Sequence, residues 1–253
     1  MKLLVVNGNT TDAITARIAA TARAAASPGT EIVAVSAPFG ARVVGTRAED
    51  AIAAHAVLEA AARHHAGCDA VVVAISSDAG LGATRELLPI PVVGITEAAL
   101  LTACTVGGAF GVLTFGARAG AWSRELVAAY GLASRLAGIE ALDAPPAAFA
   151  DPDGFAAPLL AGIERLVARG ADAVVIAGAA FAGSAGTLQP RAPVPVLDGI
   201  ACGVAFAEML ARLGLPKPRA GSYARVPARE LGGVADAVRA LFGDKQVGGK
   251  EQA

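Results

Sequence analysis

The chain has 253 residues, of which 55% are hydrophobic, and a formal net charge of −1 at pH 7. This length suits one large α/β domain or two lobes of about 100 to 130 residues each. The absence of a basic stripe or aromatic platform excludes a typical nucleic-acid-binding surface, and no apolar run approaches the ~18 residues of a membrane span. Three cysteines without a Cys-x-x-Cys spacing exclude a disulfide framework and a zinc site.

No targeting signal stands before the first apolar segment. Lys2 leads directly into residues 3–6, and it occupies the place where a myristoylation signal needs a glycine. We therefore expect a cytoplasmic protein. Neither a metal-ligand cluster nor a dinucleotide-binding glycine fingerprint occurs, so we expect no cofactor. The expected partner is a small molecule, and neither a nucleic acid nor a membrane.

The first predicted unit is a strand over residues 3–6, a tight turn, and a helix with one apolar face. The turn contains Asn9 and Thr10, and its amide groups would point at whatever lies over the helix N-terminus, which favours an anion. The same residues suit a plain strand-to-helix turn equally well, with Thr10 or Thr11 as the helix cap.

A second strand is predicted over residues 31–35, followed by a loop and a helix over residues 48–66. The three histidines of the chain, His55, His64 and His65, all fall on this helix. None has a metal-ligand spacing to another, and no cysteine motif accompanies them. We therefore interpret them as surface residues rather than catalytic or metal-binding ones.

The most informative stretch of the sequence occurs twice, at residues 67–80 and 170–183. Gly, Asp, Ala, Val, Val, Ala, Ala and Gly recur at the same places, 103 positions apart. A repeat with so long a period indicates duplication of a whole lobe. Each copy contains a continuous apolar run, Val71 to Ile75 and Val174 to Ala177, which is typical of a buried strand in a parallel sheet.

Small or polar residues follow each apolar run at once, at positions 76–78 and 178–180. These positions are the carboxyl ends of parallel strands, where open α/β sheets place their ligand sites. We therefore expect the two strand ends, one from each lobe, to face each other across a cleft.

The remaining patterns complete the two lobes. They predict a short helix from Gly80 to Pro89, a strand over 92–95, a helix from Thr96, a strand over 110–114, a turn over 115–120, helices over 121–130 and 155–169, a strand over 193–197 and a helix from Asp198.

Two less regular segments complete the prediction. Residues 144–154 form a candidate lid or connection, and residues 216–227 form an extended return before a last helix that ends near Phe242. The polar tail over 243–253 is expected to be disordered. The predicted fold is α/β, with two pseudosymmetric lobes, each a parallel sheet flanked by helices. Residues 1–104 plus about 205–253 form the first lobe and 105–204 the second.

Four motifs lie at strand ends and in the C-terminal return. They are Val6-Asn-Gly-Asn-Thr-Thr11, Thr114, Pro195-Val-Leu-Asp-Gly199 and Arg219-Ala-Gly-Ser-Tyr-Ala224. Together they resemble the hydantoin racemase branch of the aspartate/glutamate racemase superfamily, over the chain from the first strand to about Pro227. Gly8 stands where that branch usually has a proline. The resemblance implies two pseudosymmetric lobes with the active site between them, in agreement with the repeat.

The resemblance also implies a pair of cysteines, one from each lobe. One thiolate removes the proton next to a carbonyl or carboxylate, and the other thiol returns a proton to the opposite face. These positions map onto Ile75 and Gly178, neither of which can carry a proton. Two-thiol racemisation is therefore not expected. The arylmalonate decarboxylase branch, which has a glycine for the first cysteine but keeps the second, has hydroxyl residues there that Ser76 and Ser77 resemble.

Hydroxyl and amide side chains at the strand ends are the candidate substrate-binding groups. Asn9, Thr10, Ser76, Ser77 and Thr114 would hold a carboxylate or a developing enolate oxygen. Serine and threonine after strands are also common helix caps, which is the alternative for each of them.

Four further residues are expected to complete the pocket, namely Ile75, Gly178, Ala179 and Phe181. Ile75 and Phe181 would make the pocket more apolar than the family's, so the expected ligand is bulkier and less polar.

Three residues are candidates for moving protons. Asp78 follows the first repeated strand and would act as a general acid or base if burial raised its pKa, or would simply start a helix. Cys202 lies one turn into a helix, where a thiol pKa falls, although core filling is the more usual role of cysteine. Tyr223 belongs to the C-terminal motif and would close the pocket or supply a proton.

Three functions remain open at this point. The first is a cysteine-independent enzyme that forms an enolate-like intermediate, as a lyase, decarboxylase or isomerase. The second is a racemase that uses Asp78 or Cys202 as a displaced base, and the third is a non-catalytic ligand-binding relative. In each case the expected ligand is a small carboxylate or cyclic amide, and the resemblance is compatible with a homo-oligomer.

Overall fold

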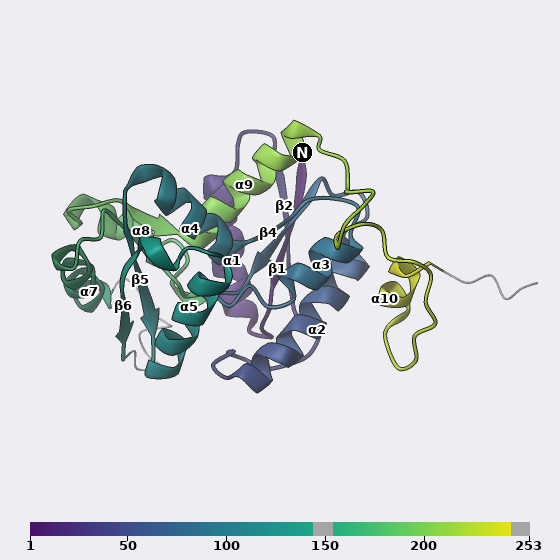
Figure 1. The fold of residues 1–253 in the computed structure, drawn as a ribbon, viewed down its shortest axis with the longest axis horizontal. Coiled ribbons are helices and arrows are strands. Elements are labelled where there is room, and N and C mark those ends of the chain that lie inside the picture. The colour runs from purple at the N-terminus through teal and green to yellow at the C-terminus, as the bar shows by residue number, and fades with distance from the viewer. Residues whose placement is uncertain (144–153, 244–253) are drawn as a thin grey trace, which may run out of the picture.

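Two four-stranded parallel sheets organise the molecule, in a computed structural model that describes residues 1–143 and 154–243 (Figure 1). The first sheet has the order β2-β1-β3-β4 and the second β6-β5-β7-β8, so the second repeats the topology of the first. This confirms the expected α/β fold of two lobes. The strands are β1 (Lys2–Asn7), β2 (Glu31–Ser36), β3 (Ala70–Ala74), β4 (Val92–Gly94), β5 (Phe110–Phe115), β6 (Leu136–Leu142), β7 (Ala173–Ile176) and β8 (Val196–Asp198).

The repeated stretch forms β3 and β7, which occupy equivalent places in the two sheets. β3 lies between β1 and β4, where Val71 pairs with Val92, and β7 lies between β5 and β8, where Val174 pairs with Val196. The carboxyl ends of β3 and β7 are therefore equivalent positions in the two lobes.

Strand β6 was not expected from the sequence. It is an edge strand in which no residue is buried, and its Gly, Ala and Glu residues interrupt both a continuous apolar run and a strict alternation. The signals that identify a buried strand are therefore missing from it.

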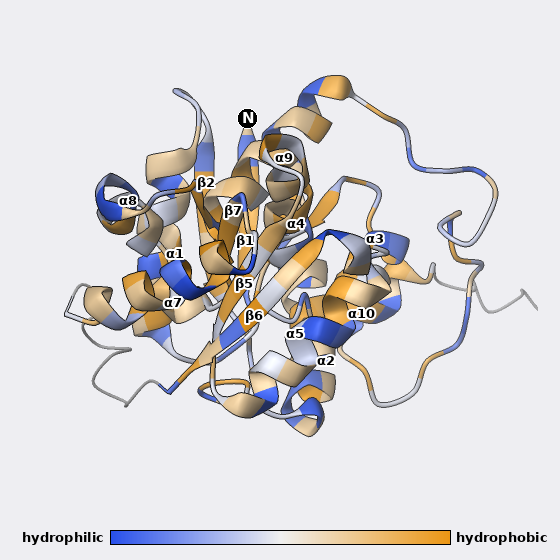
Figure 2. Ribbon diagram, turned by 60° about the vertical axis from the view of Figure 1, so that its left-hand side comes forward, coloured by the Kyte–Doolittle hydropathy of each residue, from blue (hydrophilic) through white to orange (hydrophobic). Residues whose placement is uncertain are grey.

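Helices cover both faces of the sheets and place their apolar sides inward. They are α1 (Asp12–Ala25), α2 (Arg47–His64), α3 (Leu81–Leu87), α4 (Ile95–Val106), α5 (Ala117–Ala129), α7 (Ala156–Ala168), α8 (Ser184–Leu188), α9 (Gly199–Leu213) and α10 (Asp236–Leu241), with 3-10 turns η1 (Ala133–Arg135), η2 (Ala179–Phe181) and η3 (Gln189–Arg191). Figure 2 shows hydrophobic strands enclosed by helices that are more hydrophilic on their outer sides.

The continuous apolar run of β3 is explained by the helices on its two sides. Val72 packs into a cluster with α1, α4 and α9, while Val71 and Val73 pack into another with α2 and α3. All three valines are fully buried, and burying such a side chain contributes about 1.5–3 kcal/mol.

One hydrophobic cluster extends through both lobes. It contains Val72 of β3, Leu100 of α4, Val112 of β5, Val175 of β7 and Val204 of α9. The two sheets therefore share one hydrophobic cluster, and each lobe has a further cluster on the other face of its sheet. The expected lobe boundary near residue 205 falls inside α9 and remains a prediction.

The C-terminal segment leaves the lobes after α9. Residues 214–235 form no helix or strand, so the last helix, α10, is shorter than expected. This helix packs on α2. Residues 144–153 of the candidate lid and residues 244–253 of the expected disordered tail lie outside the described residues. No helix within 1–143 and 154–243 is long and apolar enough to cross a bilayer.

Candidate active site

A cavity of about 430 Å³ opens between the carboxyl ends of the strands of both lobes. Its inner end is formed by residues that follow β1, β3 and β7 and by the end of β5, and its outer walls by a loop before α2 and by α5. Described residues that line it are Asn9, Ile14, Val43, Val44, Gly45, Ile75, Ser76, Ser77, Thr114, Phe115, Gly116, Ala117, Arg118, Ala119, Trp122, Ser123, Leu126, Ala177, Gly178, Ala179 and Ala180.

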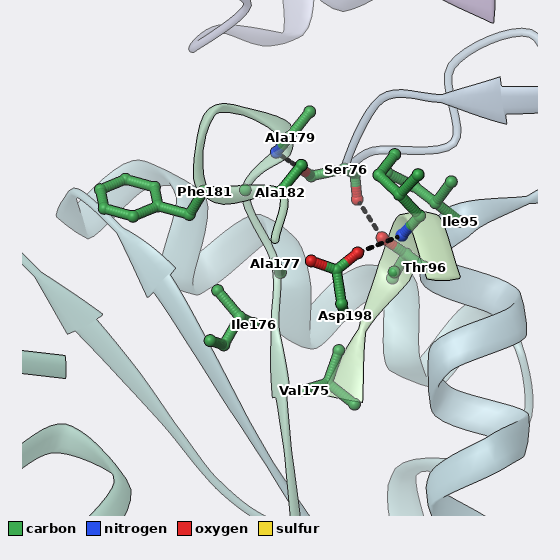
Figure 3. Close-up of a pocket in the computed structure, with 13 residues that line it drawn as sticks. Ser76, Ile95, Thr96, Val175, Ile176, Ala177, Ala179, Phe181, Ala182 and Asp198 are labelled. Atoms are coloured by element: carbon green, nitrogen blue, oxygen red, sulfur yellow. Dashed lines mark hydrogen bonds between the residues drawn. The ribbon is translucent and has the colours of Figure 1, made fainter. Parts of the chain in front are cut away.

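The floor of the cavity is a polar contact between the two lobes. Figure 3 shows a small pocket that adjoins the cavity and shares Ser76, Ala177, Gly178 and Ala179 with it; Ser76 lies there between Ala179 of the second lobe and Thr96 of the first. The amide of Ala179 donates to the Ser76 hydroxyl oxygen at 3.2 Å, and the Thr96 hydroxyl donates to the Ser76 carbonyl at 2.8 Å. Ser76 therefore joins the two repeated strand ends, and its own hydroxyl proton has no acceptor among the contacts described.

Asn9 lies in the turn after β1 with its amide orientation fixed. Its Oδ1 accepts from Asn7 Nδ2 at 3.0 Å and from the Thr11 backbone amide at 2.9 Å. Because the oxygen is occupied, the Nδ2 group is the part left to face the cavity that Asn9 lines. Asn9 therefore lines the cavity with its oxygen already bonded, and its predicted role in holding an anion stays a prediction.

Thr10 does not line the cavity. Both its backbone amide and its hydroxyl donate to the carbonyl of Ala41, at 3.1 and 3.3 Å, so it ties the turn to the loop before α2. Thr11 stands at the N-cap of α1, but its hydroxyl donates to the carbonyl of Arg42 at 2.7 Å and makes no cap. The expected role of Thr10 in holding an anion is therefore not supported.

Ile75 and Gly178 line the cavity from the ends of β3 and β7, at the positions where the resemblance implied thiols. A β-carbon on Gly8 would lie 2.8 Å from Ile75 Cδ1, so the glycine in the first turn makes room for the isoleucine. In the other lobe, a β-carbon on Gly178 would lie 2.8 Å from Cε2 of Phe115. In each lobe a large apolar side chain therefore packs against a glycine: Ile75 packs against Gly8, and Phe115 packs against Gly178.

Phe181 lies behind the cavity wall. Its ring stacks on Phe115 with centroids 3.9 Å apart and an interplanar angle of 8°, and Phe115 is the ring that lines the cavity. Phe181 is 1% exposed. It therefore lies outside the lining of this cavity, supports the Phe115 wall and lines the adjoining pocket of Figure 3, while Ala179 lines the cavity itself. The substrate-binding roles of the two residues stay predictions.

Thr114 lines the cavity, but its hydroxyl proton is already used. It donates to the carbonyl of Ala177 at 3.2 Å, so only the oxygen lone pairs of Thr114 are available to a ligand. Ser77 lines the cavity too, and its hydroxyl donates to Asp50 Oδ1 at 2.5 Å. Burial raises the pKa of Asp50 above its ordinary value, while the bond from Ser77 lowers it.

Asp78 is buried away from the cavity. Its carboxylate accepts from the backbone amides of Thr96 and Glu97, at 3.1 and 2.8 Å, and from the Tyr130 hydroxyl at 2.6 Å. Burial, the largest effect, raises the pKa of Asp78 to about 7. The side chain caps α4 and links it to the end of α5, so its predicted catalytic role is not supported by its position.

Cys202 and Tyr223, the other two predicted catalytic residues, also lie away from the lining. Cys202 is buried in α9, within the core that both lobes share, and burial raises the pKa of its thiol. Tyr223 is 40% exposed and lies near α3, where its hydroxyl oxygen would be 3.7 Å from a β-carbon on Gly82. The structure does not bring the three predicted proton carriers together.

Several lining residues were not predicted from the sequence. Val43, Val44, Trp122 and Leu126 form the apolar outer walls, and Arg118 is the one ionisable side chain among the described residues that line the cavity. The predicted turn over residues 115–120 was the sequence signal that could have pointed to the wall formed by α5. No group of three or more His, Cys, Asp or Glu side chains in the described part of the chain could hold a metal ion.

The family model and the similar proteins of known sequence agree on one family. A family model described as Asp/Glu/Hydantoin racemase matches residues 3–207. A hydantoin racemase from Pseudomonas sp. (strain NS671) is 34% identical over 88% of this chain and 91% of its own length, and one from Paenarthrobacter aurescens is 32% identical over 88% and 96%.

Solved structures agree with these sequence matches. Allantoin racemase from Klebsiella pneumoniae superposes with a TM-score of 0.86 at 35% identity, covering 94% of this chain and 98% of that one. Arylmalonate decarboxylase superposes with a TM-score of 0.59 at 17% identity, over 89% and 98%, which shows a shared fold alone.

Proposed function

The chain belongs to the Asp/Glu/hydantoin racemase family, and from this premise we propose that it acts on a small carboxylate or cyclic amide at the carbon next to the carbonyl group. The reaction is a lyase or isomerase reaction that passes through an enolate-like intermediate and uses no cysteine.

The cavity at the ends of β3 and β7 is the observation that carries this proposal. It lies at the site of catalysis expected for two such lobes, it retains hydrogen-bond donors for an oxyanion, and it holds Ile75 and Gly178 in place of two thiols. A volume of about 430 Å³ is within the range of small-molecule sites, which is about 300–1,000 Å³.

The names of the relatives support the substrate class. Hydantoin and allantoin are both cyclic amides that carry a hydrogen on a carbon next to a carbonyl group. Removing that proton, or losing a carboxyl group from the same carbon, places negative charge on the carbonyl oxygen.

Two side chains are suited to stabilise that oxyanion. Asn9 lines the cavity with its Oδ1 occupied, which leaves Nδ2 as its donor for a ligand. Ser76 accepts from the Ala179 amide, and among the described contacts its hydroxyl proton is not donated to any acceptor. Losing one preorganised donor of this kind costs about 10²–10³-fold in rate. We therefore assign Asn9 and Ser76 to the intermediate rather than to proton transfer.

A racemase with a displaced base has less support, because Asp78 and Cys202 do not line the cavity. A non-catalytic binding protein is the second candidate. It is favoured by one observation: among the described lining residues none is an aspartate, glutamate, histidine, cysteine, lysine or tyrosine.

Proton NMR in D2O distinguishes the two. The panel holds hydantoins, allantoin, aspartate, glutamate and substituted malonates. Deuterium entry at the carbon next to the carbonyl, or loss of a carboxyl group, supports the enzyme. Quenching of Trp122 fluorescence by panel compounds that undergo no change supports the binding protein, since Trp122 is the chain's single tryptophan and lines the cavity.

A further inference from the structure

One hydroxyl group of the described cavity lining donates to a titratable carboxylate. The described lining residues offer only Arg118 as an ionisable group, and arginine stays charged at ordinary pH. Ser77, however, lines the cavity and donates its hydroxyl hydrogen to Asp50 Oδ1 at 2.5 Å. A proton can therefore pass between the cavity and Asp50 through the Ser77 oxygen.

Asp50 is not needed as a helix cap. The N-terminus of α2 is closed by Thr46 and Glu49, which form a reciprocal capping box, and Glu49 Oε2 also accepts from the Gly45 amide at 2.9 Å. Asp50 follows in the same first turn, and within the described residues the contact of its carboxylate is the Ser77 hydroxyl.

Asp50 and Asp78 differ in the hydrogen bonds that their carboxylates accept. Asp78 accepts three hydrogen bonds and lies away from the cavity, so its carboxylate is fully occupied. Asp50 accepts one, from a residue of the cavity wall. Partial burial raises the pKa of Asp50, which makes it a better base than an ordinary exposed aspartate.

We propose that Ser77 and Asp50 are the proton-transfer pair of the cavity, with Ser77 as the group that contacts the substrate and Asp50 acting through it. This inference rests on the proposed function and supplies the acid–base group that the lining lacks.

The step balances without any further reactant. The Ser77 oxygen takes the proton from the substrate carbon while the Ser77 hydroxyl proton moves to the Asp50 carboxylate. The C–H electron pair becomes the C=C bond of the enolate, and the carbonyl π pair moves to the oxygen held by Asn9 and Ser76. In a decarboxylation Asp50 begins protonated by solvent. The C–C pair takes the same path as carbon dioxide leaves, the Ser77 hydroxyl proton goes to the carbon while the Asp50 proton moves to the Ser77 oxygen, and Asp50 then takes up a new proton from solvent.

The pair serves one face of the substrate. Ser77 belongs to the first lobe. On the second-lobe side, Phe115, Gly178, Ala179 and Ala180 carry no transferable proton, and the Thr114 hydroxyl donates to the Ala177 carbonyl. Ser123 of α5 also lines the cavity, but its hydroxyl has no carboxylate partner among the described contacts. With Ser77 and Asp50 as the transferring pair, deprotonation and reprotonation therefore occur from the same side. The expected outcome is hydrogen exchange without inversion, in contrast to a racemase with two thiols.

The test follows the (R)- and (S)-enantiomers of 5-isopropylhydantoin separately in D2O, by proton NMR and chiral chromatography. The wild-type protein is expected to exchange the C5 hydrogen of one enantiomer and to leave its configuration unchanged. Asp50→Asn and Ser77→Ala are each expected to lower the turnover number by about 10²–10⁴-fold, with KM within about threefold.

Three further measurements separate chemistry from structure. Asp50→Glu, which keeps a carboxylate, is expected to recover part of the rate, and added formate is expected to restore part of it to Asp50→Ala. Asp236→Asn, at an exposed position of α10, is the matched control and keeps the wild-type rate. Trp122 fluorescence titration with the same hydantoin reports binding by each variant independently of turnover.

The outcomes distinguish the two proposals. Exchange that persists in Asp50→Asn and Ser77→Ala overturns the pair but leaves cysteine-independent chemistry in place. Racemisation of either enantiomer overturns the pair as well, because it requires a second proton donor on the Gly178 side. Neither exchange nor loss of a carboxyl group with any panel compound, by the wild-type protein, overturns both proposals.

Discussion

At the scale of single residues, the two positions where the resemblance implied thiols are closely packed in this structure. Ile75 fills space that a side chain at position 8 would need, and Phe115 covers Gly178 in the other lobe. In both cases a glycine and a large apolar side chain form a matched pair. The effect of a substitution at one member of such a pair on stability should therefore depend on the residue at the other member.

Gly178→Ala tests this coupling. The added β-carbon would lie 2.8 Å from the Phe115 ring, so overpacking is expected to cost about 1–3 kcal/mol in the free energy of unfolding by urea. Gly186→Ala is the matched control, because a β-carbon there meets no atom within 4 Å. Adding Phe115→Leu to Gly178→Ala is expected to recover stability. Additive effects of the two substitutions would contradict the coupling.

At the scale of elements, a distant residue caps α4. The residue at the N-cap, Gly94, has no side chain, and Asp78 supplies the missing acceptor to the amides of Thr96 and Glu97. Gly94 is required there, because a β-carbon on it would lie 2.5 Å from Asp78 Cγ. The Tyr130 hydroxyl bonds the same carboxylate, so the cap of α4 is also a link to the end of α5.

The buried cap makes stability depend on pH. The pKa of Asp78 rises from 3.8 to about 7 in the folded protein, so the folded state binds more protons than the unfolded state between these values. The contribution of this group is fully present below pH 3.8 and is lost as pH rises to about 7. At about 1.4 kcal/mol per pKa unit, the loss is about 4 kcal/mol.

Asp78→Asn checks this dependence by urea unfolding at a series of pH values. The variant loses the titrating group, so its unfolding free energy relative to the wild type should improve between pH 4 and 7 and stay constant above pH 8. Parallel curves for the two proteins over the whole range would refute the assigned shift.

At the scale of the whole molecule, two pseudosymmetric sheets share one hydrophobic core through α4 and α9. Arg47 at the start of α2 and Glu125 of α5 form an ion pair across the two outer walls of the cavity, with two N–O contacts of 2.6 and 2.7 Å. Exposed pairs of this kind contribute about 0–1 kcal/mol, so the shared core and not this pair holds the lobes together.

The shared core predicts one unfolding transition. Trp122 reports on the second lobe, while far-UV circular dichroism reports on helices of both. In urea the two signals are expected to change together, because neither sheet can separate without exposing the common cluster. Two transitions with different midpoints would show that the lobes unfold independently.

Features that depend on local residue patterns could be predicted from the sequence. The repeat predicted β3 and β7, their equivalence and the cavity at their ends, since continuous apolar runs and the small residues after them are local signals. It could not reveal that Asp78 caps α4, because the two amides lie 18 and 19 positions away. Asp50 was missed for the same reason, as Ser77 is 27 positions distant. Strand β6 and the outer walls depend on packing at an edge and a loop, where local pattern is weak.

The central claim is enolate chemistry without cysteine, and a cysteine-free protein tests it most directly. Cys68, Cys104 and Cys202 are the three cysteines of the chain, and none lines the cavity. Each is replaced by alanine, and deuterium entry into 5-isopropylhydantoin is followed by NMR beside the wild-type protein. Exchange is expected to proceed at the wild-type rate within about threefold, because no cysteine takes part. Loss of exchange in a variant that keeps its circular dichroism spectrum and binds the hydantoin would show that a thiol carries the chemistry.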